Sequence, residues 1–138
     1  MKSPNTPSPP PCISSPLVRG GGNGRSRHMK IKLNESDSKV VQSNETYDVI
    51  DNESLDTLVV SKTVLHPDKT TRGHAHTGQE EIYLYLSGIG TMQVADEQIP
   101  VTQGDIVLIP DSAFHKVANT GTDDLLFISI FNGNRQVN

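Results

Sequence analysis

Residues 81–86 read Glu-Ile-Tyr-Leu-Tyr-Leu, and this stretch decides the fold that we expect for the chain. Aromatic and β-branched residues of this kind suit the pleated surface of a β-strand. Because successive side chains of a strand point to opposite faces, Glu81, Tyr83 and Tyr85 should share one face. The stretch therefore predicts a strand that presents a carboxylate and two aromatic rings on the same side.

Similar short apolar runs recur along the chain from Met29 onward, with turn residues between them. None of these runs has the periodicity of an amphipathic helix, so the pattern is typical of an all-β sandwich or barrel. We predict strands at residues 30–33, 47–50, 57–65, 71–76, 81–86, 90–95, 98–101, 105–109, 115–118 and 125–131.

Three histidines and one glutamate have spacings that a single metal ion could gather: His74, His76, Glu81 and His115. One residue separates His74 from His76, so both imidazoles should leave the same side of an extended segment. His115 follows a second apolar run, residues 105–109. On neighbouring strands we expect the four side chains to converge on one point.

At these residues the sequence resembles the two motifs of the cupin superfamily. The first motif is Gly, five residues, His, one residue, His, three or four residues, Glu, six residues and Gly. Four residues fit it, and Asp68 stands where the leading glycine belongs; the four are His74, His76, Glu81 and Gly88.

The second cupin motif is Gly, five residues, Pro, one residue, Gly, two residues, His, three residues and Asn. Ser112 replaces its internal glycine, and the other positions match at Gly104, Pro110, His115 and Asn119. Both departures from the family pattern therefore concern turn glycines and leave the four ligand positions filled.

The motifs span residues 68–119, and the resemblance extends by strand pattern to about residues 29–131. It implies the double-stranded β-helix or jelly-roll barrel of cupins, formed by a single domain at residues 29–138. It also implies a homodimer that pairs through its terminal strands, residues 30–33 or 125–131.

The resemblance further implies that His74, His76, Glu81 and His115 bind one divalent transition metal ion. Imidazole and carboxylate without thiolate suit Fe, Mn, Ni, Co or Zn. Glu80 competes with Glu81 for the carboxylate position, because the family tolerates either spacing. Strand alternation favours Glu81, since Glu80 should point to solvent.

Three further residues are candidates for binding a substrate: Arg72, Tyr83 and Tyr85. Arg72 precedes His74 by two residues, so its guanidinium should reach the ligand face and could bind a carboxylate or phosphate. A solvated surface arginine and two core tyrosines are the alternative interpretation. His66, next to Pro67, has no partner at motif spacing, and we expect it to be structural.

Composition favours one domain in a chain of 138 residues. Residues 34–138 carry 16 acids against six bases, a net charge of about −10, which argues against a nucleic-acid surface. No apolar run is long enough to span a bilayer. We therefore expect a soluble, cytoplasmic protein that acts on a small molecule, without nucleic-acid or membrane partners.

Residues 1–28 contain six prolines, four glycines and five serines, a composition that predicts disorder. The sequence His28-Met29 resembles a cloning junction. We interpret residues 1–28 as a leader derived from an expression vector. An organellar transit peptide, rich in Arg and Ser and free of acids, is the alternative.

The metal site favours an enzyme that acts on a small polar metabolite such as a sugar phosphate or keto sugar, in an isomerase-type reaction. The ion would act there as a Lewis acid. A non-haem Fe(II) dioxygenase and a non-catalytic cupin that binds a small ligand are the alternatives. No catalytic residue besides the ligands is assigned from the sequence.

Overall fold

The computed structural model of the protein describes residues 29–34, 38–133 and 135. The chain divides into two units, Met1–Lys30 and Ile31–Asn138, and the strands found among the described residues belong to the second. The predicted leader, residues 1–28, lies outside the described residues. Within the described ranges, no helix has the length and apolar character needed to cross a membrane.

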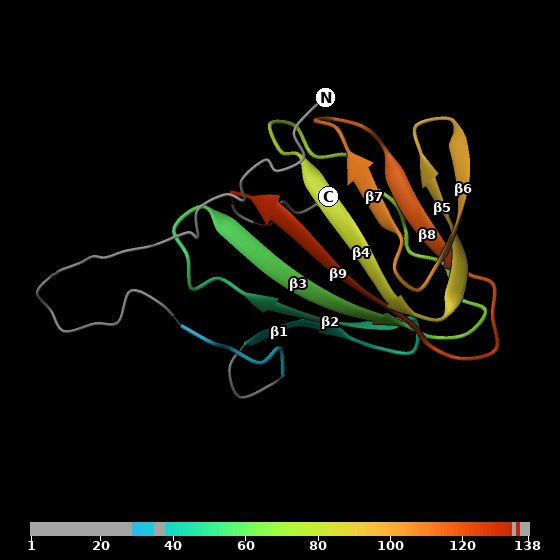
Figure 1. The fold of residues 1–138 in the computed structure, drawn as a ribbon, viewed down its shortest axis with the longest axis horizontal. Coiled ribbons are helices and arrows are strands. Elements are labelled where there is room, and N and C mark those ends of the chain that lie inside the picture. The colour runs from blue at the N-terminus through green and yellow to red at the C-terminus, as the bar shows by residue number, and fades with distance from the viewer. Residues whose placement is uncertain (1–28, 35–37, 134, 136–138) are drawn as a thin grey trace, which may run out of the picture. The chain divides into compact units, whose positions relative to one another are not determined.

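Nine antiparallel strands form two sheets in the described part of the chain (Figure 1). The larger sheet has the order β1-β2-β3-β9-β4-β7, and the smaller has the order β6-β5-β8. The strands are β1 (Lys39–Ser43), β2 (Tyr47–Asn52), β3 (Leu58–Leu65), β4 (Glu81–Ser87), β5 (Ile89–Val94), β6 (Glu97–Thr102), β7 (Ile106–Ile109), β8 (His115–Asn119) and β9 (Leu125–Asn132). The all-β jelly-roll expectation is therefore confirmed.

The core lies between the two sheets, because each strand turns alternate side chains inward. Both sheets contribute to one apolar cluster, which comprises Leu65, Tyr83, Tyr85, Met92, Val101, Val107, Ile109, Val117, Leu125 and Phe127. Burial of each large apolar side chain stabilises the fold by about 1.5–3 kcal/mol. Glu81, Tyr83 and Tyr85 all face this interior, as the alternation predicted.

Of the two strands predicted at the ends of the domain, the first is wrong and the second is confirmed. Residues 30–33 form no strand. The edge strand next to β2 is β1, which was not predicted from the sequence. The strand at residues 125–131 exists as β9, but it lies between β3 and β4 and is hydrogen-bonded on both sides. Because both edges of β9 are occupied, residues 125–131 cannot pair edge to edge with a second subunit.

The predicted strand at residues 71–76 is a connection that runs beside β8. Single bridges join Thr70 to Ala118 and His74 to His115, with no continuous ladder between them. Gly73 interrupts the extended backbone with a φ of 84°, and a Cβ there would lie 2.6 Å from the Phe114 ring. Only glycine combines this torsion with so close an approach, so the segment bends where a strand would continue.

The two motif positions that lack glycine keep a glycine-like backbone. Asp68 has a φ of 66° and Ser112 a φ of 71°, both in the left-handed region. Such torsions cost side-chain-bearing residues about 1–3 kcal/mol each. The turns of both cupin motifs are thus retained at some cost in strain.

Asn119, the last residue of the second motif, holds the β8–β9 connection. Its Nδ2 donates to the carbonyl of Leu65 at 2.8 Å and to that of Asp123 at 2.9 Å. Its Oδ1 accepts the backbone N–H of Gly121 at 2.9 Å. Because Asn119 is buried, these bonds replace the hydrogen bonds to water that its amide loses on folding. The role of Asn119 is therefore structural.

His66 links three segments at the end of β3. Its backbone N–H donates to Thr46, and its ring nitrogens lie 3.0 Å from Asp124 Oδ1 and 3.4 Å from Asp48 Oδ2. The hydrogen bond with Asp124 raises the pKa of His66, burial opposes it, and the charges of both carboxylates reinforce the rise.

We predict that His66→Gln destabilises the protein more at about pH 5.5 than at about pH 8.5. Because the folded-state pKa is raised, protonated His66 contributes its full stabilisation below pH 6.5 and loses it as the pH rises through that pKa. Thermal melts of both proteins at the two pH values measure the difference. An equal loss of Tm at both values would contradict the assignment.

Candidate metal centre

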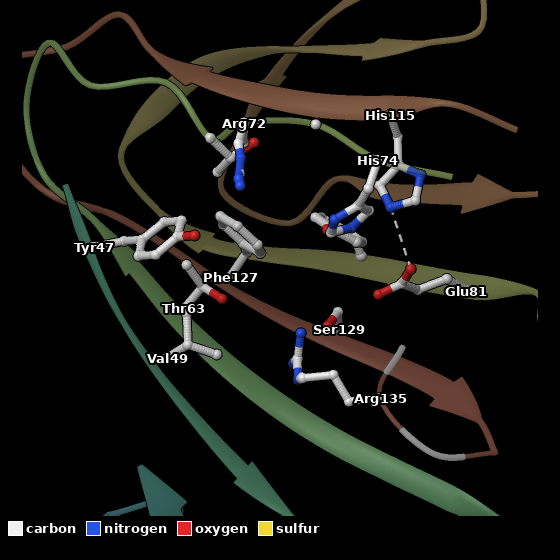
Figure 2. Close-up of a pocket in the computed structure, with 13 residues that line it drawn as sticks. Tyr47, Val49, Thr63, Arg72, His74, Glu81, His115, Phe127, Ser129 and Arg135 are labelled. Carbon is white, nitrogen blue, oxygen red and sulfur yellow. Dashed lines mark ion pairs between the residues drawn. The ribbon is translucent and has the colours of Figure 1, made fainter. Parts of the chain in front are cut away.

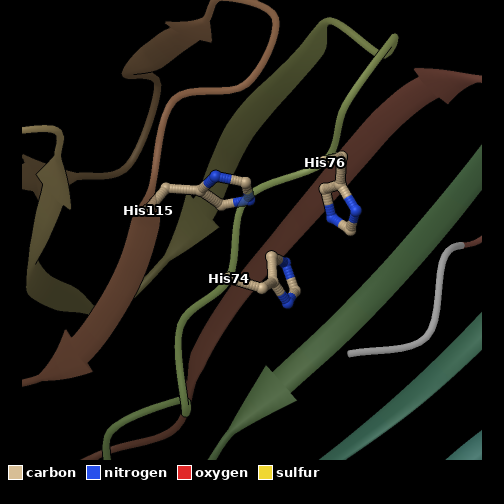
Figure 3. A group of neighbouring side chains, drawn as sticks. All are labelled: His74, His76 and His115. Carbon is tan, nitrogen blue, oxygen red and sulfur yellow. The ribbon is translucent and has the colours of Figure 1, made fainter.

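Three histidines converge at one end of the core, as Figure 3 shows. Each of His74, His76 and His115 offers a ring nitrogen, and these nitrogens all lie within 4.8 Å of one another. The His74 ring centroid lies 4.2 Å from that of His76 and 4.7 Å from that of His115. One small cation can contact all three nitrogens from a common point.

Backbone hydrogen bonds hold His74 beside His115, although 41 positions separate them in the sequence. The N–H of His74 donates to the carbonyl of His115 at 3.1 Å, and the N–H of His115 donates to the carbonyl of His74 at 2.9 Å. Directly paired residues of antiparallel segments project their side chains to the same face. The carbonyl of His76 accepts the N–H of Ser112 at 3.0 Å, which fixes the third ring beside the other two.

Glu81 completes the cluster from the first residue of β4. Its Oε1 lies 3.3 Å from His115 Nε2 and 3.9 Å from His76 Nε2, and the residue is 7% exposed. Glu80 is exposed, so the structure orients these two glutamates as strand alternation suggested. Glu81 is therefore the carboxylate available to a metal ion held by the histidines.

The tautomer of His115 suits metal binding. Its Nδ1 lies 3.0 Å from the carbonyl of Ala113, which requires that Nδ1 carry the proton and donate it. Nε2 then presents a lone pair toward Glu81 Oε1, and both atoms are buried without a hydrogen-bond partner. The two atoms lie 3.3 Å apart and can share one cation, either a proton or a metal ion.

His74 is held in the neutral form that a metal requires. Burial, followed by the charges of His76 and His115, lowers the pKa of His74 to about 4. Its ring is therefore unprotonated at neutral pH and can bind a metal ion without first releasing a proton. The donor set of three imidazoles and one carboxylate fits a divalent transition metal ion.

Three members of the cluster, His74, Glu81 and His115, line the cavity that is shown in Figure 2. The cavity is open to solvent and has an accessible volume of about 80 Å³. Its lining combines hydroxyl, imidazole, carboxylate and guanidinium groups with a few apolar side chains, and consists of Tyr47, Val49, Thr63, Thr71, Arg72, Gly73, His74, Glu81, Tyr83, His115, Phe127, Ser129 and Arg135. The polarity of this lining suits a small polar molecule.

Two of the three predicted substrate contacts line this cavity, and one does not. Arg72 lies on its exposed rim. Tyr83 stacks on Phe127 with ring centroids 4.9 Å apart, and burial raises its pKa, so its hydroxyl stays protonated. Tyr85 is fully buried in the core and donates its hydroxyl to Met92 Sδ, so it does not reach the cavity.

Arg135 lines the cavity although no sequence signal singled it out. It follows the last strand, outside both motifs, and nothing in its neighbourhood marks it as functional. Its charge is one of the smaller influences that lower the pKa of His74, after burial and the two neighbouring histidines. Thr63 and Ser129 were also missed, although strand alternation places both on inward faces.

The sequence profile of the cupin domain matches residues 61–131, slightly more than half of the chain. The chain belongs to the cupin domain family. It is 31% identical over 100 residues to the glucose-6-phosphate isomerase of Pyrococcus horikoshii, an alignment that covers 63% of this chain and 53% of that protein. This cupin chain thus spans about half the length of such relatives.

Solved structures share the cupin fold at low sequence identity. KdgF from a Halomonas species is 18% identical with a TM-score of 0.63, and covers 73% of this chain and 91% of its own. A Bacillus subtilis oxalate decarboxylase studied for its Mn(II) centres is 22% identical with a TM-score of 0.70, and covers 87% of this chain and 34% of its own. These likenesses concern the fold.

We predict that His115→Ala weakens divalent metal binding at least tenfold, because it removes the ligand with the most tightly held orientation. Elemental analysis of protein purified without chelators should find about one transition metal ion per wild-type chain. Titration with Mn(II) or Co(II) would then measure the loss. His66→Ala is the matched control, and equal metal content in all three proteins would overturn the assignment.

Proposed function

We propose that this cupin binds one divalent transition metal ion through His74, His76, Glu81 and His115 and is a metal-dependent isomerase. Its substrate would be a small polar metabolite such as a sugar phosphate or keto sugar. The observation that carries the proposal is the opening of the ligand cluster into a polar cavity. A purely structural metal site would be closed by protein ligands on every side.

The similarity to glucose-6-phosphate isomerases supports the proposal of an isomerase reaction. A bound divalent ion would polarise the oxygens of a carbonyl and a neighbouring hydroxyl, which lowers the cost of an enediolate. The chain itself would orient the sugar, with hydroxyls from Tyr47, Thr63 and Ser129 along the cavity wall. The protonated hydroxyl of Tyr83 can donate a hydrogen bond to a developing oxyanion.

We predict interconversion of aldose and ketose phosphates under strict anoxia, tested first with glucose 6-phosphate and fructose 6-phosphate. The activity should disappear with a chelator and return with Mn(II), Fe(II), Co(II), Ni(II) or Zn(II). His76→Ala should lower kcat/KM at least a hundredfold, about 2.7 kcal/mol of transition-state stabilisation. Exposed Glu80→Gln is the control and should stay within about twofold of the wild type.

Two results would count against the isomerase. Turnover of candidate substrates that stops without dioxygen would favour the Fe(II) dioxygenase. Tight, metal-dependent binding of sugar phosphates with no turnover would favour the non-catalytic cupin.

We also propose that the chain forms a homodimer through the outer face of its larger sheet. Ile106 and Leu108 of β7 are 59% and 69% exposed, and Ile82 lies directly opposite Leu108 on β4. These side chains form an apolar patch at the sheet edge that carries no charge of its own. A second copy with the same patch is the simplest partner that removes it from water.

We predict that Ile106→Glu with Leu108→Glu gives a monomer, because two buried charges would oppose the apolar interface. Light scattering at micromolar concentration measures the mass, and the metal content should be unchanged. Gln98→Glu, an exposed change on β6 in the other sheet, is the control. A monomeric wild-type protein would refute the interface.

A further inference from the structure

Arg135 lies on the cavity wall and is anchored by buried partners on the larger sheet. Its Nε donates to Asp51 Oδ2 at 2.7 Å and its Nη2 donates to Asp51 Oδ1 at 2.8 Å. Nη2 also donates to Ser61 Oγ at 3.0 Å. The guanidinium lies over the Phe131 ring, with its Cζ 5.2 Å from the ring centroid. These contacts fix the plane and the direction of the group.

The anchoring carboxylate is not available to solvent. Asp51 is 1% exposed, and Ser61 is also 1% exposed. Burial lowers the pKa of Arg135, but the hydrogen bond and charge of Asp51 outweigh it and the net effect raises that pKa. The guanidinium therefore stays charged, and its Nε and Nη2 edge is fully used.

The remaining nitrogen, Nη1, donates to no other residue in the described part of the chain. Figure 2 shows the guanidinium directed into the cavity, near Ser129 and on the side facing the metal ligands. Nη1 carries two N–H donors, and Arg135 is one of the residues that line the cavity. A group held this way is ready to bind an oxyanion without reorganising.

We propose that Arg135 forms the anion subsite of the cavity and selects metabolites that carry a carboxylate or phosphate beside their metal-binding oxygens. This inference rests on the proposed metal-dependent function. It assigns the anion-binding task to Arg135, in addition to the exposed Arg72 that the sequence suggested. The shared chemistry of the ligand is a terminal oxyanion on a small hydroxylated molecule.

The electrostatics of the cavity favour such a ligand. Asp51 and Arg135 have no net charge as a pair. The carboxylate is bonded to the Nε and Nη2 edge of the guanidinium, so a ligand in the cavity meets the positively charged Nη1 side. Glu81 alone would repel an anion, and the divalent ion of the proposed site reverses that charge. The two positive groups then both border the cavity, and each can hold one end of a substrate.

Three acids that share the same 2-hydroxycarboxylate end test the subsite: glycerate, malate and 3-phosphoglycerate. Their other ends are a neutral hydroxymethyl group, a carboxylate and a phosphate. Calorimetric titration into the Co(II)-loaded full chain should show malate or 3-phosphoglycerate binding at least tenfold more tightly than glycerate. The stronger of the two identifies the anion, carboxylate or phosphate.

The Arg135→Gln variant should bring the three dissociation constants within about threefold of one another while glycerate and Co(II) bind as before. Because this change leaves Asp51 buried and unpaired, the double variant Asp51→Asn with Arg135→Gln provides a second test in which both charges are removed. Lys39→Gln, which removes an exposed cation of β1, is the control and should keep the wild-type discrimination.

Three results would overturn the subsite. The first is equal affinity of the wild type for all three acids. The second is an unchanged preference for malate or 3-phosphoglycerate in both the Arg135→Gln variant and the double variant. The third is a preference that is lost in Arg72→Gln and kept in Arg135→Gln. Absence of bound Co(II) would instead refute the proposed metal function. In that case the same titrations are made on metal-free protein. Binding of malate or 3-phosphoglycerate that depends on Arg135 would support the anion subsite, and no such binding would refute the subsite.

Discussion

The pair of backbone hydrogen bonds between His74 and His115 is the interaction on which the site depends. It joins the connection after β3 to the start of β8, two segments that the chain separates by the whole of β4 to β7. Further main-chain bonds join the same two segments on either side, from the N–H of Thr71 to the carbonyl of Val117 and from the N–H of Ser112 to the carbonyl of His76. Because the bonds are made by the main chain, they hold the rings at one place whichever side chains surround them.

Gly73 makes this pairing possible. A regular strand at residues 71–76 would have formed a continuous hydrogen-bonded ladder with β8. Every second side chain of the segment would then have pointed to the same face of the sheet. The positive φ of Gly73 allows contact at Thr70 and again at His74, with a bend between them. The bend places Arg72 on the rim of the cavity while His74 turns inward. Gly73 therefore separates the exposed Arg72 from the half-buried His74.

Strand alternation accounts for most of what the sequence could predict. It identified the inward face of β4 and distinguished Glu81 from Glu80, because a period of two fixes which side chains share a face. It could not tell how deep each inward residue lies, so Tyr83 reaches the cavity while Tyr85, on the same face, ends in the core against Met92. Depth depends on the packing of the second sheet, which no local pattern encodes.

Arg135 escaped prediction for a different reason. Its side chain is positioned by Asp51, which lies 84 positions away on β2. In the sequence, Asp51 cannot be distinguished from the many acidic residues expected at the surface. Long-range pairs of this kind leave no periodic signal, and only the fold brings them together. The missed strand β1 is similar, since its Lys-Val-Val-Gln-Ser sequence is largely exposed at a sheet edge and has little apolar pattern.

The proposed metal site and Arg135 are connected through the larger sheet. Glu81 begins β4 and Asp51, which orients Arg135, lies on β2 of the same sheet, while His115 begins β8 of the smaller one. Backbone hydrogen bonds hold the strands of a sheet in register, so the carboxylate of Glu81 and the anchor of Arg135 keep a fixed relative position. A ligand that contacts both the metal ligands and Arg135 must therefore match that arrangement. Selection by shape follows from the sheet, in addition to selection by charge.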